Sequence, residues 1–183
     1  ADEINSNGGS AIAIECDVKN CESIQLSIEK TINKFSSLNI LVNNAQEVPL
    51  GNLLDVSDES FANGWKSGPM ATFRFMKACH PYLKGGGKII NLASSSALRP
   101  DSGSYGAYAA VKESIRSLSR AAAVEWGPDK ILVNCIMPLA NSTGLDWWMN
   151  EYPDEAAEFL KTIPMGKVGD CKDDIGEAVC HLL

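Results

Sequence analysis

Short apolar runs alternate with longer segments of helical periodicity, and this alternation constrains the fold of the 183-residue chain more than any other feature. The short runs are rich in Ile and Val, too short for a helix, and lack the alternation of a half-exposed strand, so they predict buried parallel strands; they are residues 11–14, 40–42, 88–90 and 131–133. Longer segments with a 3.6-residue apolar period are residues 21–35, 58–83, 105–126 and 146–160. Repeated strand, helix and strand predict an α/β fold: a three-layer α/β/α, Rossmann-like, doubly wound parallel sheet in a single domain, residues 1–183.

Composition and charge exclude several classes of function. The chain carries 16 basic and 23 acidic residues, a formal net charge of -7, which would repel the phosphates of nucleic acid. No apolar run approaches the roughly 20 residues of a membrane-spanning helix. Six cysteines without a Cys-x-x-Cys spacing favour a reducing, cytoplasmic environment. His80 and His181 are isolated, so we expect no metal site.

Polar residues follow the predicted strands at the point where each strand ends. They are Asp17-Val18, Asn43 to Gln46, Asn91 to Ser96, and the loop from Pro138 to Thr143. Each group alone is explained by helix capping and turns. In a parallel sheet, however, the carboxyl ends of the strands meet at one edge, and ligands bind there. We therefore expect a ligand site at this edge.

Tyr108 and Lys112 lie one helical turn apart in the segment 105–126. Residues spaced i and i+4 project from the same helix face. A phenol with a pKa of about 10 exchanges protons poorly at neutral pH unless a cation favours its ionised form, and Lys112 can supply that cation. The alternative is an ordinary surface pair. A cluster of serines, residues 94–96, precedes the pair at a strand end and favours the chemical interpretation.

These motifs, in this order and spacing, resemble those of the short-chain dehydrogenase/reductases. The resemblance implies reversible hydride transfer between NAD or NADP and a carbonyl or secondary alcohol. Tyr108 would exchange the proton with the substrate oxygen, Lys112 would lower the pKa of Tyr108 and bind the nicotinamide ribose, and a serine would polarise the same oxygen. Alignment of the strand selects Ser94 and counting back from Tyr108 selects Ser95; we favour Ser94, because strands resist insertion better than loops.

The resemblance also implies a set of cofactor contacts. Asp17 and Val18 would meet the adenine, and Asn44 and Ala45 the adjoining ribose region. Pro138, Asn141 and Thr143 would meet the nicotinamide carboxamide. Residues 147–149, Trp-Trp-Met, follow this loop where the family has a mobile helix over the substrate, which would suit an apolar small molecule; packing against the core is the alternative.

Several features depart from the family pattern. The resemblance places the start of the chain inside the helix before the family's third strand, and its end before the last strand, so that the Gly-rich phosphate loop and the residue that selects NAD or NADP have no counterpart. Gln46 stands where the family has Gly, and Gly68 where many members have an Asn that completes a proton relay to the lysine. Pro69 also breaks the helix. Our hypothesis is that the break frees a carbonyl or seats a water and so keeps the relay working; an ordered water that bridges Gly68 to Lys112 would support it.

Three classes of function follow from these features. The first is a catalytic oxidoreductase, favoured by the tyrosine, lysine and serine. The second is a noncatalytic dinucleotide-binding or regulatory relative, motivated by Gly68 and Gln46. The third is a structural subunit. In all three, the resemblance implies a homodimer or homotetramer formed through the helices in segments 58–83 and 105–126.

Overall fold

Three parallel strands form the centre of the protein in a computed structural model that describes residues 1–98 and 104–183. The strands are β1 (Ile40–Asn43), β2 (Lys88–Leu92) and β3 (Leu132–Ile136), adjacent in that order. Their register places Leu41, Ile89 and Val133 side by side, and all three pack in the hydrophobic core. The predicted α/β class and the parallel sheet are confirmed.

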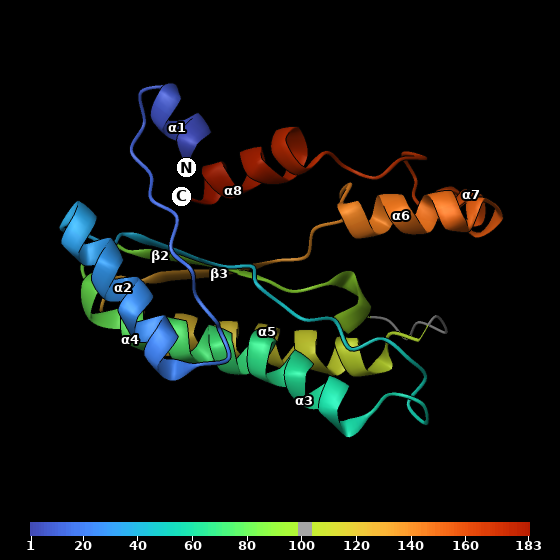
Figure 1. Cartoon of the computed structure of the whole chain (residues 1–183), viewed down its shortest axis with the longest axis horizontal. Helices are drawn as coiled ribbons and strands as arrows, with labels where there is room; N and C mark the ends of the chain where they lie inside the picture. Colours follow the sequence, from blue (N-terminus) through green and yellow to red (C-terminus); the bar gives the residue numbers. More distant parts are fainter. Residues whose placement is uncertain (99–103) are drawn as a thin grey trace.

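Three helices supply the other wall of that core: α2 (Cys21–Phe35), α4 (Ala71–Leu83) and α5 (Gly106–Glu125). They lie together on one side of the sheet (Figure 1). Each contributes a buried apolar stripe with helical spacing; the buried members are Ile24, Ile28, Met76, Cys79, Leu83 and Ala122. The sheet and these helices therefore enclose a single apolar cluster beneath the strands.

The other elements connect or flank this core. They are α1 (Asp2–Ser6), α3 (Asp58–Trp65), η1 (Lys66–Met70), η2 (Ser95–Ala97), α6 (Thr143–Glu151), α7 (Pro153–Lys161), η3 (Cys171–Gly176) and α8 (Glu177–Leu182). In Figure 1, α1, α6, α7 and α8 lie on the side of the sheet opposite α2, α4 and α5. No helix in the described ranges is long and apolar enough to cross a membrane.

Residues 11–14 were wrongly predicted as a strand. A strand requires a neighbouring strand for its backbone groups, whereas the amide and carbonyl of Ala11 bond to the side chain of Asn5, at 2.8 and 3.1 Å. These bonds occupy the backbone of Ala11, and no described strand pairs with residues 12–14. The segment is therefore not part of the sheet.

Two predicted helices are divided in the structure. The segment 58–83 becomes α3, the π turn η1 and α4, because Pro69 lacks the amide that an α-helix needs at this position. The segment 146–160 becomes α6 and α7. Pro153 begins α7, and Tyr152 before it leaves the helical region with φ -128° and ψ 63°.

A buried amide joins the centre of the sheet to α5. Asn91 on β2 is fully buried; its Oδ1 accepts a 2.7 Å hydrogen bond from Asn43 on β1, and its Nδ2 donates to Ser119 Oγ on α5 at 2.8 Å. Asn91 and Asn43 thus satisfy one another inside the fold. Their position at strand ends has a structural explanation.

Candidate active site

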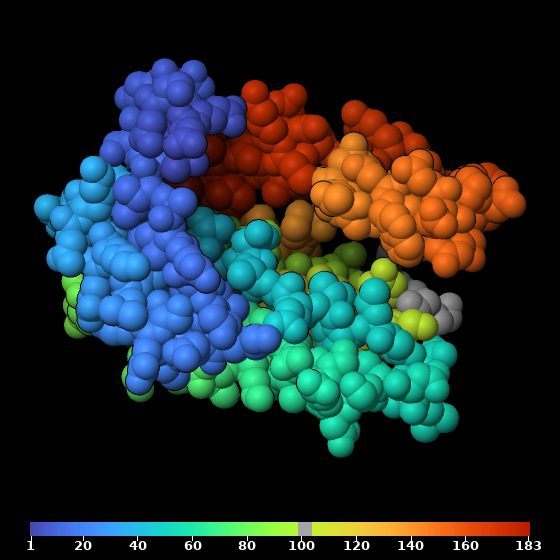
Figure 2. Space-filling view, in the orientation of Figure 1, coloured from blue at the N-terminus to red at the C-terminus, as the bar shows by residue number. Residues whose placement is uncertain are grey.

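The carboxyl ends of the three strands define the edge where the sequence places a ligand site. They point toward the side where α6 and α7 lie opposite the start of α5 (Figure 1). Figure 2 shows the surface hollowed there, between the orange segment that holds α6 and α7 and the cyan-to-yellow segments facing it. The residues that border this edge come from η2, α5 and the loops that follow β1 and β3.

Lys112 is a buried cation at this edge. It lies on α5 with 4% of its surface exposed, and its Nζ donates a 2.7 Å hydrogen bond to the carbonyl of Leu92, the last residue of β2. Burial disfavours the charged form and lowers the pKa of Lys112 to about 8. The ammonium is thus held by the end of the central strand.

Tyr108 lies one turn before Lys112, with its ring centroid 5.6 Å from Lys112 Nζ. Burial raises the pKa of Tyr108 above its ordinary value, and a hydrogen bond with the Ser94 side chain offsets part of that rise. The resemblance to the short-chain dehydrogenase/reductases implies the opposite direction, in which Lys112 lowers the pKa of Tyr108. In this structure the desolvation of the phenol outweighs the favourable contacts, so Tyr108 holds its proton at neutral pH.

Ser94 is the serine whose hydroxyl lowers the pKa of Tyr108. It follows the end of β2 and precedes η2, where its hydroxyl accepts a hydrogen bond from the amide of Ser96 at 3.2 Å. Ser95 begins η2. The count that favoured Ser95 depends on the loop after Leu98, and residues 99–103 of that loop lie outside the described residues.

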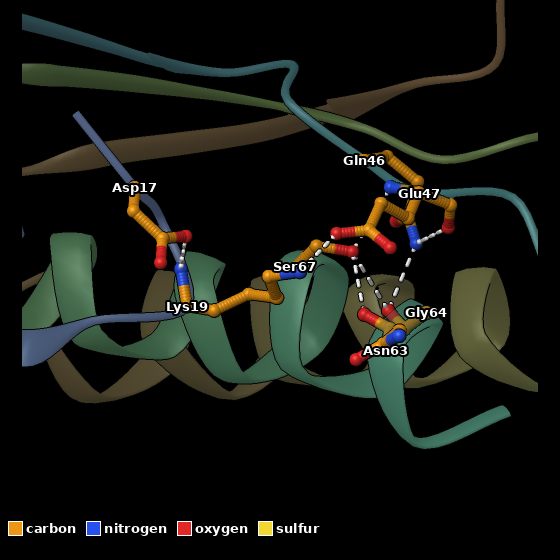
Figure 3. Close-up of polar contacts among 7 residues, drawn as sticks. All are labelled: Asp17, Lys19, Gln46, Glu47, Asn63, Gly64 and Ser67. Carbon is orange, nitrogen blue, oxygen red and sulfur yellow. Dashed lines mark hydrogen bonds and ion pairs between the residues drawn. The ribbon is translucent and has the colours of Figure 1, made fainter. Parts of the chain in front are cut away.

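Two predicted cofactor segments are held together by an ion pair. The turn with Asp17 and Val18 continues into Lys19, and the loop with Asn44 and Ala45 continues into Glu47. Lys19 Nζ lies 2.5 Å from Glu47 Oε1, and the Asp17 carboxylate accepts from the amide of Lys19 at 2.9 Å (Figure 3). The pair thus links segments that are 28 positions apart in sequence.

The loop from Pro138 to Thr143 is tied to the segment before η3. The amide of Asn141 donates to the carbonyl of Gly169 at 2.9 Å, and Ser142 caps α6, of which Thr143 is the first residue. Within the next helix, the Trp148 ring meets Phe159 of α7 edge to face at 5.8 Å, whereas Trp147 is 60% exposed. Trp147 also meets the Tyr152 ring edge to face at 6.4 Å, so both tryptophans have an aromatic neighbour and Trp147 keeps most of its surface exposed.

Gln46 and Gly68, two separate departures in the sequence, contact each other. A Cβ on Gly68 would lie 2.3 Å from Gln46 Oε1, a distance at which atoms overlap. Sequence reasoning missed this pairing. The available signal was the coincidence of an unexpected side chain at one position with a missing one at another.

The described residues contain no group of three His, Cys, Asp or Glu side chains that could hold a metal ion. His80 Nε2 instead lies 2.9 Å from the Asp129 carboxylate, near the start of β3.

Comparison with known proteins agrees with this fold. All 183 residues match the family described as enoyl-(acyl carrier protein) reductase. A 12alpha-hydroxysteroid dehydrogenase of a Clostridium species is 40% identical over 163 residues, which cover 88% of this chain and 62% of the relative. A versicolorin reductase 1 of Dothistroma septosporum is 30% identical over 189 residues, which cover 97% of this chain and 71% of the relative. This chain therefore spans less than two thirds of the first relative's length.

Solved structures share the architecture. A dehydrogenase/reductase from Sinorhizobium meliloti 1021 is 26% identical with a TM-score of 0.86, covering 97% of this chain and 69% of that one. A short-chain dehydrogenase from Burkholderia cenocepacia J2315, solved in complex with NADP, is 24% identical with a TM-score of 0.89. The match covers 98% of this chain and 71% of that one, and it shows a shared fold. The chain belongs to the short-chain dehydrogenase/reductase family, and the Rossmann-like prediction is confirmed.

The pKa of Lys112 predicts a pH-dependent difference in stability between the wild type and Lys112→Met. Between pH 8 and 10.5 the unfolded chain holds this proton and the folded state does not, so the wild type gains stability as pH rises through that window. Below pH 8 both states are protonated and the difference is constant. We expect a gain on the order of 2 kcal/mol from pH 7 to 10, measured by urea unfolding of both proteins. If the free energy of unfolding changes with pH in the same way in both proteins, Lys112 is not a buried cation.

Proposed function

We propose that this site transfers a hydride reversibly between NAD or NADP and a carbonyl or secondary alcohol. The observation that carries the proposal is the meeting of a phenol, a hydroxyl and a buried ammonium at the carboxyl edge of the sheet: Tyr108, Ser94 and Lys112. These are the groups that proton transfer to a polarised oxygen requires. Membership of the short-chain dehydrogenase/reductase family supports the same reaction.

The residues present fit a nicotinamide dinucleotide. An ammonium has three N–H donors, and within the described residues Lys112 Nζ uses one of them on Leu92, which leaves two for ribose hydroxyls. Asp17, Val18, Asn44 and Ala45 would contact the adenosine end. Pro138, Asn141 and Thr143 would contact the carboxamide end. When bound, the dinucleotide would supply or accept the hydride.

The raised pKa of Tyr108 suits the direction of carbonyl reduction. A phenol that keeps its proton at neutral pH can donate it to the substrate oxygen as negative charge develops there. Ser94 would donate a hydrogen bond to the same oxygen. Lys112, cationic below its pKa of about 8, would stabilise the phenolate that remains.

We further propose a fairly apolar substrate. Trp147 on α6 is 60% exposed, and the helix follows the loop proposed to meet the nicotinamide. An exposed indole offers apolar area to a flat molecule. The names of the two relatives, a 12alpha-hydroxysteroid dehydrogenase and a versicolorin reductase, support a polycyclic alcohol or ketone.

A noncatalytic dinucleotide-binding protein is the second candidate. Gly68 has no side chain where many family members carry Asn, and burial raises rather than lowers the pKa of Tyr108. Binding of NADH or NADPH without turnover on a panel of polycyclic ketones would favour this candidate. Turnover of any one of them favours the oxidoreductase.

Replacement of Tyr108 by Phe tests the proton transfer. We expect the variant of the full-length protein to lose on the order of 100-fold to 10,000-fold in kcat, because the general acid is gone, while its Kd for NADH or NADPH changes little. The matched control is Tyr105→Phe, since the Tyr105 ring lies 6.0 Å from that of Tyr108 and is of the same type. Equal turnover in the two variants would refute the mechanism.

Ser94 and Ser95 are distinguished by a pair of alanine substitutions. Ser94→Ala should lower kcat by roughly 100-fold, the effect of removing one donor to a developing oxyanion. Ser95→Ala removes the hydroxyl of the next residue and should keep most of the turnover. The opposite ranking, measured under saturating substrate and dinucleotide, would assign the role to Ser95.

We propose that the protein forms a homo-oligomer through an apolar groove between α5 and the continuous run α3–η1–α4. Trp65 and Phe73, 38% and 45% exposed, line one side, and Ser117 and Ala121 line the other. Phe73→Arg should shift the sedimentation coefficient toward that of a monomer, because a charge would be buried in the interface. Leu26→Arg on α2, which replaces a residue 54% exposed, is the control and should leave the coefficient unchanged.

A further inference from the structure

Two glycines on one helix face pack against the chain that follows β1. Gly64 and Gly68 are four residues apart, so they lie on the same side of α3 and η1. A Cβ on Gly64 would lie 2.7 Å from Pro49 Cδ, and a Cβ on Gly68 would lie 2.3 Å from Gln46 Oε1. A side chain at either position would therefore overlap residues 46–49 as they lie here, and either Pro49 or the Gln46 amide would have to move.

The Gln46 side chain meets a need created by Pro69. In the i to i+5 register of a π turn, the amide of residue 69 would be the partner of the Gly64 carbonyl, and proline has no amide hydrogen. Gln46 Nε2 donates to that carbonyl at 2.9 Å. Beside it, Ser67 Oγ donates to the carbonyl of Asn63 at 2.7 Å (Figure 3). The Gln46 side chain thus supplies the donor that Pro69 lacks, while the Asn63 carbonyl also accepts from the backbone amide of Lys66.

The orientation of the Gln46 amide is determined by its partners. Nε2 also donates to the carbonyl of Glu47 at 2.8 Å, and two carbonyl partners can only be met by the NH₂ end. Oε1 therefore points toward Gly68, where it is buried and has no hydrogen-bond partner in the ranges described.

The same contacts fix the segments that would bind the dinucleotide. Asn44 and Ala45 directly precede Gln46, and the next amide, of Glu47, donates to Ser67 Oγ at 2.9 Å. Glu47 in turn pairs with Lys19, whose carbonyl accepts from Arg74 Nη1 of α4 at 2.8 Å. Figure 3 shows the part of this chain that runs from Lys19 through Glu47 and Ser67 to Gly64. Displacing Gln46 would loosen both segments at once.

We propose that Gln46 and Gly68 are a complementary pair, in which Gln46 is a positioning residue that holds the loop after β1 on the π turn and thereby sets the affinity for the nicotinamide dinucleotide. The inference rests on the proposed function. It adds to that function a role for two residues that depart from the family pattern, and it makes the effect of each residue depend on the other.

A double-mutant cycle in the full-length protein tests the pair. Gly68→Ala places a methyl group in the space of Gln46 Oε1, and Gln46→Ala removes the side chain; each should raise the Kd for NADH or NADPH by about tenfold. In the Gln46→Ala background the methyl group meets no amide. The additional effect of Gly68→Ala should then fall below about twofold. Kd is measured by the change in nicotinamide fluorescence well below the Tm of each variant.

The control is Gly176→Ala, which adds a methyl group to another π turn, η3, where the nearest atom is 3.4 Å from the new Cβ. It should leave Kd unchanged. A merely structural role would lower the Tm of Gly68→Ala and Gln46→Ala without raising their Kd, and that result overturns the inference. So does a Gly68→Ala effect of equal size in both backgrounds. If the wild type binds neither dinucleotide, the proposed function fails, and the inference with it.

Discussion

The hydrogen bond from Lys112 Nζ to the Leu92 carbonyl is the contact on which the candidate site depends. Seven residues, about two helical turns, further along α5, Ser119 Oγ accepts from Asn91, the residue before Leu92. The helix is therefore held to the end of β2 by two polar contacts on one face. With the helix so fixed, Tyr108, one turn before Lys112, comes to lie beside Ser94 just past the strand. The geometry of the three groups follows from the attachment of α5.

Burial gives the tyrosine and the lysine opposite shifts. The pKa of Tyr108 rises and the pKa of Lys112 falls to about 8, because each loses the water that stabilises its charged form. At neutral pH the phenol is neutral and the ammonium is mostly charged. This combination has a donor ready for a substrate oxygen and a nearby cation for the phenolate that results. The desolvation that opposes ionisation in the resting site also strengthens the attraction between phenolate and ammonium.

The sequence predicted the parts of the fold that depend on regular periodicity. The bounds of α2, residues 21–35, and the strands β1, β2 and β3 were close to those observed, because apolar spacing follows the period of each element. The expected burial of the strands was wrong for β1, where Ile40 and Val42 are 45% and 47% exposed. It failed at residues 11–14, where Asn5 satisfies the backbone of Ala11 and nothing in the apolar pattern reveals that competition. The meeting of Ser94 with Tyr108 was expected from the order of motifs. The direction of the Tyr108 pKa shift was not, since desolvation depends on packing that a single sequence does not specify.

The π turn shows why departures from a family pattern must be considered together. Gln46 alone would find no space, because any Cβ at position 68 would overlap it. Gly68 alone would leave an opening beside a buried turn. Pro69 alone would leave the Gly64 carbonyl with a long 3.4 Å bond from Ser67 Oγ in place of the 2.9 Å bond from Gln46 Nε2. Together the three residues satisfy one another: the proline removes an amide, the glutamine supplies one, and the glycine makes room for it. A change at any one position therefore alters the constraint on the other two, and through Glu47 and Lys19 it reaches the segments proposed to hold the dinucleotide.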